Sequence, residues 1–347
     1  MWLVTSLLVV GLVRGAAWAR EAAKARDIQL AGIVDLDEEK LGQIGDELGV
    51  PHANRFASFE AALAAPADVV VLAVPTPLHK PLSLAALEAG RHVICEKPLA
   101  ASLEEGRELR DAVATYDRRY MIGEQYRFAD GVENLRRAVQ SGLIGRVGYI
   151  EHQFLRMHTP SRAAHWAHDL DSAIPEMSVH HFDMWWYATG QRIVEIRADP
   201  FNPSWNPPGR RFGYSMRATL EDGTHVHYLA CRAESRPQTS WHGVITIVGD
   251  EGALTWDGNG PAVTYLRRLP SPDPRQQQLA VGPVSYVNNG TVGNATMNLM
   301  VRELVDAIRE GRPHQCDVAD NWPSFATAMA ALESVRGGGV PVKVAAS

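Results

Sequence analysis

A short apolar run that ends in an acid, a base and a proline constrains this chain more than any other stretch. Val93 to Cys95 is followed by Glu96, Lys97 and Pro98, and a proline cannot donate the next hydrogen bond of a strand ladder. The pattern predicts a short buried strand that ends where the chain places charge. In open α/β sheets the carboxyl ends of the strands line the ligand crevice, so Lys97 is a candidate for chemistry. A solvated Glu–Lys pair in a turn is the competing interpretation of these three residues.

Length and charge limit the classes of protein to which the chain can belong. A chain of 347 residues is too long for one small core and suits two domains with a cleft between them. We place the domain boundary near residue 124, which gives domains over 1–124 and 125–347. A formal net charge of -6 argues against a nucleic-acid partner.

The cysteines and the apolar stretches bear on the cellular compartment. Cys95, Cys231 and Cys316 are widely separated, which indicates neither a disulfide framework nor a zinc site, and we expect a reducing, cytoplasmic location. The apolar residues 1–13, followed by A-A-W-A, are similar to a short signal peptide. However, no basic segment precedes them and their removal would delete the first predicted strand, so we expect them to be part of the fold. No other stretch approaches the roughly 20 apolar residues of a membrane span.

The first predicted strand and helix enclose the turn G-L-V-R-G-A. Leu7 to Val10 predicts a buried strand and residues 14–24 predict a helix. Against the dinucleotide-binding pattern G-x-G-x-x-G/A, Gly11 matches the first position and Ala16 the third, but Val13 stands at the second, where a side chain hinders approach of the pyrophosphate. Gly15 offers another point of close approach, and the helix N-terminus offers N–H groups to a phosphate. Weaker cofactor binding is the alternative consequence of Val13.

Asp35 ends the second predicted strand, over 29–34, at close to the usual spacing from Gly11. A carboxylate at this point accepts hydrogen bonds from the ribose hydroxyls and repels a 2′-phosphate, and no arginine follows it. We therefore predict NAD rather than NADP. A turn or helix-cap role is the structural alternative for Asp35.

From about residue 125 the pattern changes to alternating segments, which predict strands of a sheet with one face covered. These segments are 147–156, 193–198, 214–220, 226–231 and 244–248. Helices are predicted over 132–142, 296–310 and 325–335, and a polar loop over 270–278. The predicted class is therefore α/β, with an N-terminal doubly wound parallel sheet and a C-terminal α+β domain containing a large, mostly antiparallel open sheet.

Five motifs together resemble the Gfo/Idh/MocA family of nicotinamide-dependent oxidoreductases, over nearly the whole chain. They are A-V-P-T-P-L-H (73–79), A-L-E-A-G (86–90), E-K-P (96–98), G-E-Q-Y-R-F (123–128) and H-H-F-D (180–183). The resemblance implies a Rossmann domain over 1–124 that binds NAD. It also implies a substrate-binding and oligomerisation domain over 125–347, with a homodimer or homotetramer formed through its sheet.

The resemblance extends to the cofactor contacts. It implies that Pro75 and Thr76 lie along the nicotinamide side with His79 nearby, and that Glu96 and Gln125 lie close to the ribose. The family more often has Asn at the position of Gln125. With the first turn included, the expected cofactor contacts are Gly11, Val13, Arg14, Gly15, Ala16, Asp35, Ala73, Pro75, Thr76, His79, Glu96, Lys97 and Gln125.

Oxidation of a secondary alcohol by NAD requires a base with a pKa near neutrality within reach of the hydroxyl. Glu176 and His180 are four residues apart and share a face if the segment is helical. The family pattern D-x-x-x-H-x-x-D implies that His180 transfers the proton, that Glu176 replaces the usual Asp, and that Lys97 polarises the reacting oxygen. A hydrogen-bonded His180–His181 pair packed near Trp185 is the structural alternative.

The substrate is expected to be a small polyhydroxylated molecule. Polar donors and an indole face suit such a ring, and the expected substrate contacts are Lys97, Arg127, Arg156, His158, Trp166, Glu176 and His180. We expect no metal, because His152, His158, His165 and His168 have no carboxylate or cysteine at ligand spacing.

Three functions are compatible with these residues. The first is NAD-dependent hydride transfer between the nicotinamide and a secondary hydroxyl of a sugar, cyclitol or glycoside. In the second, tightly bound NAD oxidises a substrate transiently during glycoside cleavage or isomerisation. The third is a non-catalytic, dinucleotide-binding regulatory protein, which Val13 would suit but which needs neither Lys97 nor His180.

Overall fold

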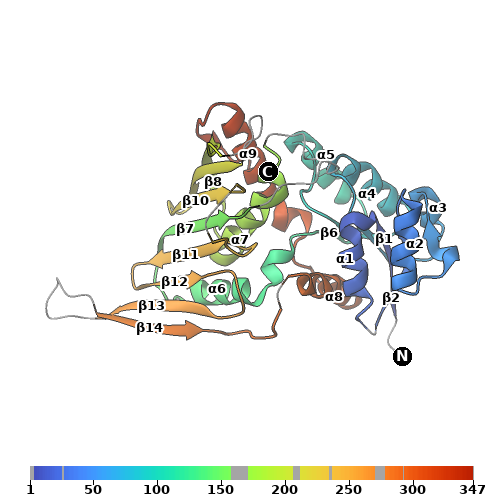
Figure 1. The fold of residues 1–347 in the computed structure, drawn as a ribbon, viewed down its shortest axis with the longest axis horizontal. Helices are drawn as coiled ribbons and strands as arrows, with labels where there is room; N and C mark the ends of the chain where they lie inside the picture. Colours follow the sequence, from blue (N-terminus) through green and yellow to red (C-terminus); the bar gives the residue numbers. More distant parts are fainter. Residues whose placement is uncertain are drawn as a thin grey trace. The chain divides into compact units, whose positions relative to one another are not determined.

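The computed structural model describes residues 4–25, 27–157, 171–205, 212–233, 237–269, 278–291 and 293–346 (Figure 1). By its internal contacts the chain divides into two compact units, Met1–Gln125 with Gly293–Trp322, and Tyr126–Val292 with Pro323–Ser347. The segment 293–322 thus groups with the N-terminal residues, which the division at residue 124 did not include. The assignment of functional domains to 1–124 and 125–347 stays a prediction.

The N-terminal unit contains a parallel sheet of six strands in the order β3-β2-β1-β4-β5-β6. This order reverses between β1 and β4, as in a doubly wound nucleotide-binding fold. The strands are β1 (Thr5–Val10), β2 (Ile28–Val34), β3 (Arg55–Phe56), β4 (Val69–Leu72), β5 (His92–Cys95) and β6 (Tyr120–Ile122). β4 is apolar throughout, and β1 and β5 end in apolar runs, because helices cover both faces of such a sheet. The predicted Rossmann sheet is confirmed.

Helices follow these strands, and several begin at residues that cap them. Asp37, Ser58 and Ser102 accept hydrogen bonds from the backbone N–H three residues further on and so begin α2, α3 and α5. The helices are α1 (Leu12–Ala22), α2 (Glu38–Glu47), α3 (Phe59–Leu63), α4 (His79–Glu88) and α5 (Leu103–Val113), with 3₁₀ turns η1 (His52–Asn54), η2 (Thr76–Leu78) and η3 (Gln125–Phe128).

The helix α8 (Ala295–Glu310) returns from far along the sequence to lie beside α1 (Figure 1). Its buried face carries Met297, Met300 and Leu304, which repeat at helical spacing. The Asn298 amide donates to the Glu21 carbonyl at 2.7 Å, so a polar contact fixes the register of the two helices. The N-terminal unit is therefore completed by residues near the C-terminus.

The C-terminal unit contains a nine-stranded sheet in the order β14-β13-β12-β11-β7-β10-β9-β8-β15. β7 and β10 pair in parallel, and the other strand pairs in the described part of this sheet are antiparallel. The strands are β7 (Val147–Leu155), β8 (Ile193–Phe201), β9 (Gly213–Leu220), β10 (His225–Cys231), β11 (Val244–Gly249), β12 (Gly252–Trp256), β13 (Val263–Leu269), β14 (Gln278–Val284) and β15 (Val342–Lys343). The predicted mostly antiparallel sheet is confirmed; the predicted loop at 270–278 lies almost entirely outside the described residues.

Helices cover one face of this sheet, as Figure 1 shows for α6, α7 and α9. They are α6 (Asp130–Gln140), the π-helical turn η5 (Ile174–Ser178) with α7 (Val179–Thr189), and α9 (Val318–Arg336). Along β7, Ile150, His152 and Phe154 are buried, whereas the intervening side chains are exposed. Gly131 on α6 lies against Trp256 of β12, where an added Cβ would lie 2.2 Å from the indole. The core lies between the helices and this face of the sheet.

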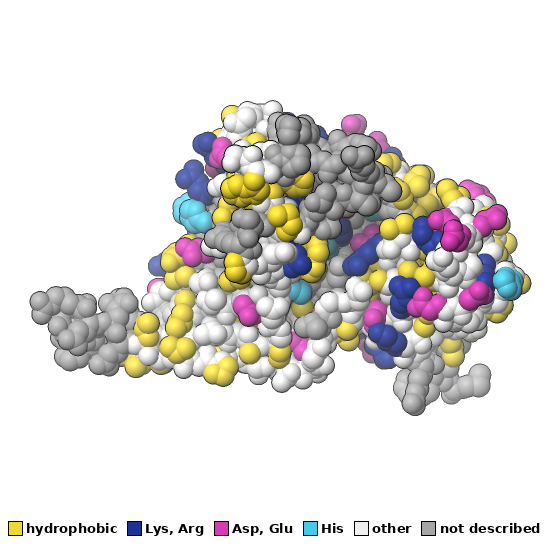
Figure 2. Space-filling view, viewed as in Figure 1, with side chains coloured by type: hydrophobic (Ala, Val, Ile, Leu, Met, Phe, Trp, Pro, Cys, Tyr) yellow, Lys and Arg dark blue, Asp and Glu magenta, His cyan; other side chains and the backbone are white. Residues whose placement is uncertain are grey.

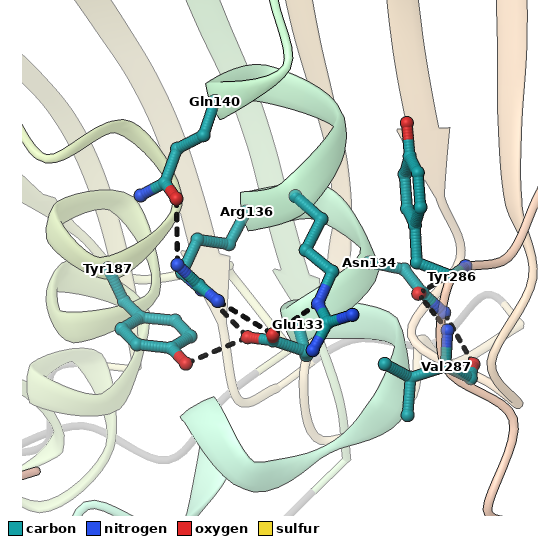
Figure 3. A network of polar contacts seen from close by, with 8 residues as sticks. Glu133, Asn134, Arg136, Gln140, Tyr187, Tyr286 and Val287 are labelled. Carbon is teal, nitrogen blue, oxygen red and sulfur yellow. Dashed lines mark hydrogen bonds and ion pairs between the residues drawn. The ribbon is translucent and has the colours of Figure 1, made fainter.

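Two neighbouring residues of α6 organise polar contacts on opposite sides of the helix (Figure 3). The Asn134 amide donates to the carbonyls of Pro261 and Val287 and accepts from the N–H groups of Tyr286 and Val287, at 2.7 to 2.8 Å. Glu133 binds two arginines of its own helix and the Tyr187 hydroxyl of α7. Burial raises the pKa of Glu133, but these donors outweigh it and lower the pKa to about 2. Asn134 thereby fixes the chain that leaves β14.

No helix within the described ranges is long and apolar enough to span a membrane. On the face drawn in Figure 2, acidic and basic side chains are interspersed over the N-terminal unit. All three cysteines, Cys95, Cys231 and Cys316, are free and buried.

Candidate functional site

The predicted cofactor residues of the N-terminal unit gather at the carboxyl edge of the parallel sheet. Val10 of β1 pairs with Leu72 of β4, and Leu72 pairs with Cys95 of β5. The residues that follow these strands, Gly11, Ala73 and Glu96, therefore lie side by side. This edge, at the reversal of strand order, is where doubly wound folds bind nucleotides.

Gly11 and Gly15 fit the first turn for steric reasons. Gly11 has φ +84°, and a Cβ there would lie 2.4 Å from the Ala73 carbonyl oxygen, so a larger residue would strain the turn. A Cβ on Gly15 would lie 2.9 Å from Val9, so this glycine lets α1 pack closely on β1. Close helix–strand packing is the task of the third glycine of the dinucleotide pattern. The sequence assigned that position to Ala16, which is also buried.

Val13 lies in the first turn of α1 and is 84% exposed. Its side chain therefore does not contribute to the core. The first turn of a helix presents unsatisfied N–H groups and the positive end of the helix dipole. The prediction that Val13 lies against a bound cofactor stays a prediction.

Asp35 follows β2 and binds the backbone of two turns. Its Oδ2 accepts from the Leu12 N–H at 2.6 Å, and its Oδ1 accepts from the Asp37 N–H at 3.0 Å. The carboxylate thus links the end of β2 to the start of α1 and remains partly exposed. A carboxylate has about four acceptor sites, so these two bonds leave capacity for ribose hydroxyls.

Glu96, which precedes Lys97, is a buried acid held by two side chains of α1. Its Oε1 accepts from the Trp18 indole nitrogen at 2.8 Å and from Arg14 Nε at 3.2 Å. Gln125, with its amide oxygen turned toward Arg14, accepts from the Arg14 Nη2 at 2.9 Å. Arg14 therefore joins Glu96 and Gln125, all of which the sequence had assigned to the cofactor.

Trp18 was not among the predicted site residues, although the sequence contains a signal for it. It lies four residues after Arg14, so both side chains project from one face of α1. Trp18 is 1% exposed, and a buried indole N–H requires an acceptor. The acceptor is the acid of E-K-P.

His79 begins α4 and lies beneath the turns that follow β4 and β5. Its ring is 1% exposed, with Nδ1 2.8 Å from the Pro98 carbonyl oxygen and Nε2 3.0 Å from the Val74 carbonyl oxygen. Both polar atoms are thus occupied by the protein itself. Pro75 is exposed and Thr76 and Lys97 are partly exposed, so these residues reach the surface of the unit. A direct contact between His79 and the cofactor stays a prediction.

His180, in the C-terminal unit, lies on α7 and stacks on Tyr126. The two ring centroids are 4.3 Å apart with an interplanar angle of 18°, and His180 is 3% exposed. Glu176 is partly exposed and lies in the π-helical turn that leads into α7. The segment is helical as expected, but the turn is wider than an α-turn, and such turns often occur at functional sites.

Arg127 and Asp183 form a buried ion pair in the C-terminal unit. Arg127 Nε lies 2.9 Å and Nη2 2.5 Å from the two Asp183 oxygens, and both side chains are at most 1% exposed. Ser324 of α9 also donates to Asp183, at 2.9 Å. In this structure the Arg127 guanidinium therefore holds α7, and its predicted contact with substrate stays a prediction.

The neighbouring histidines belong to a buried aromatic cluster. His181 Nδ1 lies 2.7 Å from the Tyr228 hydroxyl, and His152 accepts from the Trp185 indole at 2.9 Å. Burial lowers the pKa of His181 well below its ordinary value and that of His152 to about 4, so both rings are neutral near pH 7. Within the parts of the chain that the structure describes, no group of three or more potential ligands could hold a metal ion.

Of the remaining predicted substrate residues, the structure describes Arg156 but not His158 or Trp166. Arg156 lies over the Trp241 ring at 4.3 Å and donates to the Thr239 carbonyl at 2.6 Å. His158 and Trp166, with His165 and His168, lie outside the described residues. The sequence analysis did not include Arg232, which directly follows β10 and is buried near Glu176. Burial lowers the pKa of Arg232 to about 10, opposed by the negative charge of Glu176.

Comparison with known proteins agrees with this architecture. The model of an oxidoreductase family with an NAD-binding Rossmann fold matches residues 6–124, and the model of the GFO/IDH/MocA C-terminal domain matches residues 132–255. The fold and the two matches define a nicotinamide-dependent oxidoreductase with a Rossmann domain. The chain belongs to the Gfo/Idh/MocA family of NAD(P)-dependent oxidoreductases.

Individual relatives are distant. An uncharacterized protein of Sinorhizobium fredii is 25% identical over 327 residues, which cover 91% of this chain and 88% of that protein. Inositol 2-dehydrogenase of Corynebacterium glutamicum is 29% identical over 201 residues, and the match covers 57% of each chain. A crystal structure of an oxidoreductase from Agrobacterium radiobacter in complex with NAD+, L-tartaric acid and magnesium has a TM-score of 0.84 at 18% identity, covering 98% of each chain. At that identity the likeness concerns the fold.

Proposed function

We propose that this protein transfers hydride between a secondary hydroxyl of a sugar, cyclitol or glycoside and the nicotinamide of NAD. The observation that carries the proposal is the turn after β5, where Glu96 is fixed by Trp18 and Arg14 and places Lys97 at the carboxyl edge of the sheet. A lysine in a solvated surface pair would have no such buried support. The inositol 2-dehydrogenase relative supports a cyclitol or sugar as substrate.

The residues at the sheet edge fit a dinucleotide. Gly11 leaves no room for a Cβ beside Ala73, so a larger side chain there would displace the turn that faces the cofactor. The start of α1 suits the pyrophosphate and Asp35 suits the ribose hydroxyls. We propose NAD rather than NADP, because the Asp35 carboxylate would repel a 2′-phosphate. The bound nicotinamide supplies the hydride acceptor.

Three residues would act on the substrate. One ring nitrogen of His180 takes the hydroxyl proton as the hydride leaves carbon, and the ring is held by its stack on Tyr126. The Lys97 ammonium donates a hydrogen bond to the same oxygen and stabilises the negative charge that develops there. Glu176 orients His180 or binds a substrate hydroxyl. We further propose that Arg156 and Trp241 contact the sugar, since a partly exposed indole suits a polyhydroxylated ring.

We also propose a cytoplasmic homodimer or homotetramer formed through the C-terminal sheet. Helices cover one face of this sheet, whereas Tyr149, Glu151 and Gln153 of β7 remain exposed on the other. The mass of the protein in solution, measured by light scattering, tests the oligomer.

The activity is tested by incubating the protein with NAD and a panel of inositols, sugars and glycosides. Absorbance follows NADH, and mass spectrometry follows the products. Accumulation of NADH with a matching oxidised product supports the proposal. Product without NADH would instead indicate transient oxidation by retained NAD. Saturable NAD binding without turnover of any substrate would favour a regulatory protein.

A further inference from the structure

The contacts of His79 fit a ring that carries a proton on both nitrogens. Both ring nitrogens lie within hydrogen-bond distance of backbone carbonyl oxygens, Pro98 at 2.8 Å and Val74 at 3.0 Å. A carbonyl oxygen only accepts, so both contacts are hydrogen bonds only when both nitrogens carry protons. A neutral ring would leave one nitrogen lone pair facing an oxygen lone pair in a site that is 1% exposed.

Several effects act on this charge, and they oppose one another. Burial disfavours an imidazolium, and so does its place at the start of α4, where the helix dipole is positive. The Cys95 sulfur of β5 and the two carbonyls favour it. Burial lowers the pKa of His79, but these groups outweigh it and raise the pKa to about 9. Tyr120 of β6, which is hydrogen-bonded to Ser83 at 3.0 Å, is a further titratable group beside Cys95.

The two carbonyls belong to the two turns that carry predicted reactive-site residues. Val74 directly precedes Pro75 and Thr76 after β4, and Pro98 directly follows Lys97 after β5. We propose that His79 is a positioning residue whose imidazolium donates to Val74 and Pro98 and so holds the Thr76 and Lys97 turns in one fixed arrangement. The consequence for turnover rests on the proposed function, whereas the charged ring and the fixed turns do not.

The charge is tested without any substrate. The 13 histidines are labelled with ¹⁵N, and their ring nitrogens are observed by NMR. The signals that disappear in His79→Gln are those of His79. We expect both nitrogens of this ring to show imidazolium shifts at pH 7.5, where an ordinary histidine is mostly neutral. The separated shifts of a neutral tautomer at that pH would overturn the proposal.

The link between the turns is tested by two substitutions that each keep one donor. The Asn amide nitrogen reaches the place of Nδ1 and the Gln amide nitrogen reaches the place of Nε2. His79→Asn should therefore release mainly the 74–78 turn and His79→Gln mainly the 97–101 turn. Hydrogen exchange by mass spectrometry should show about fivefold faster exchange in the released turn. Ser83→Ala, on the same helix, removes the bond to Tyr120 and should leave both turns unchanged.

The kinetic test separates this proposal from the proposed function. His79→Gln should lower kcat about tenfold, while KM and the Kd for NAD change less than about threefold, because Lys97 is displaced but binding groups remain. Ser83→Ala should leave kcat unchanged. If His79→Gln shows the same exchange rates and the same kcat as Ser83→Ala, the positioning role of His79 is refuted. If no polyol is oxidised by the natural protein, the proposed function fails, and the exchange and ¹⁵N results still decide the role of His79.

Discussion

The Trp18 indole nitrogen donates to the Glu96 carboxylate over 2.8 Å, so a side chain of the first helix holds the acid that precedes Lys97. Trp18→Phe removes this donor but keeps most of the ring. We expect a loss of about 1–3 kcal/mol in the free energy of unfolding, because a buried carboxylate oxygen loses a partner. Urea denaturation measures the loss. Trp205→Phe is the control, since the Trp205 indole also donates a hydrogen bond, to the Ala233 carbonyl, but the residue is 62% exposed. The loss in this variant should be clearly smaller.

Lys97→Ala should reduce turnover at least about 100-fold while the Kd for NAD changes less than about tenfold. The reason is that the proposed function assigns the reacting oxygen to Lys97 and the cofactor to Gly11, Asp35 and the start of α1. Steady-state kinetics and calorimetric titration with NAD measure the two effects. Lys80→Ala removes an ammonium group that pairs with Glu108 on the surface of the same unit, and it should change neither quantity. Unfolding of Lys97→Ala would show a structural lysine instead.

Asp35→Ser should weaken NAD binding and narrow the preference for NAD over NADP by about 10- to 100-fold. The substitution removes the charge that we propose to repel a 2′-phosphate, while the serine hydroxyl keeps an acceptor near the Leu12 N–H. Calorimetric titration with each cofactor gives the ratio. Asp37→Ser keeps a cap on α2 and removes a nearby charge. An equal change in that variant would mean that general electrostatics, not Asp35, sets the preference.

Asp183→Asn should destabilise the protein by about 3–5 kcal/mol, because it leaves the Arg127 guanidinium buried without its counter-charge. Guanidinium chloride denaturation followed by tryptophan fluorescence measures the change. Asp199→Asn breaks the Arg197–Asp199 pair, in which both side chains are nearly half exposed, and should cost less than about 1 kcal/mol. Similar losses in both variants would contradict a special role of the buried pair.

The charge on His79 predicts a pH dependence of stability. Its pKa is about 9 in the folded protein and about 6.5 when unfolded. The folded state therefore binds the proton more tightly. The resulting stabilisation, up to about 3 kcal/mol, is complete below pH 6.5 and is lost as the pH rises through 9. The difference in unfolding free energy between the natural protein and His79→Gln should shrink between pH 6 and pH 9.5, and a difference independent of pH would contradict the assignment.

The sequence predicted β1, β2 and β5 because buried parallel strands contain continuous apolar runs between turn residues, as in Val93–Cys95. The strands β12 to β14 were missed. β13 contains two adjacent arginines and β14 contains glycine and proline, which weaken a strand pattern. The pairing of α8 with α1 was also missed, because helical periodicity shows which face of a helix is buried but not what covers it.

The site was predictable where a motif fixes a residue on a strand end and less so where side chains pair across the fold. Gly11, Asp35 and Glu96 follow β1, β2 and β5 as expected. The role of Gly15 in packing α1 on β1 depends on the helix phase, which the pattern placed one residue later. The partners of Arg127 and Glu96 could not be read from sequence, because Asp183 and Trp18 approach them only after folding.

The return of residues 293–322 to the first sheet has a consequence during synthesis. A nascent chain that has emerged only as far as residue 292 still lacks α8, so the apolar side of α1 that it covers has no partner on the ribosome. The C-terminal unit is also incomplete at that stage, because β15 and most of α9 lie in residues 323–347. The N-terminal unit cannot be completed until residue 322 has left the exit tunnel, and the C-terminal unit cannot be completed until residues 323–347 have left it. Translation that stalls earlier should therefore yield an incompletely folded chain that chaperones bind.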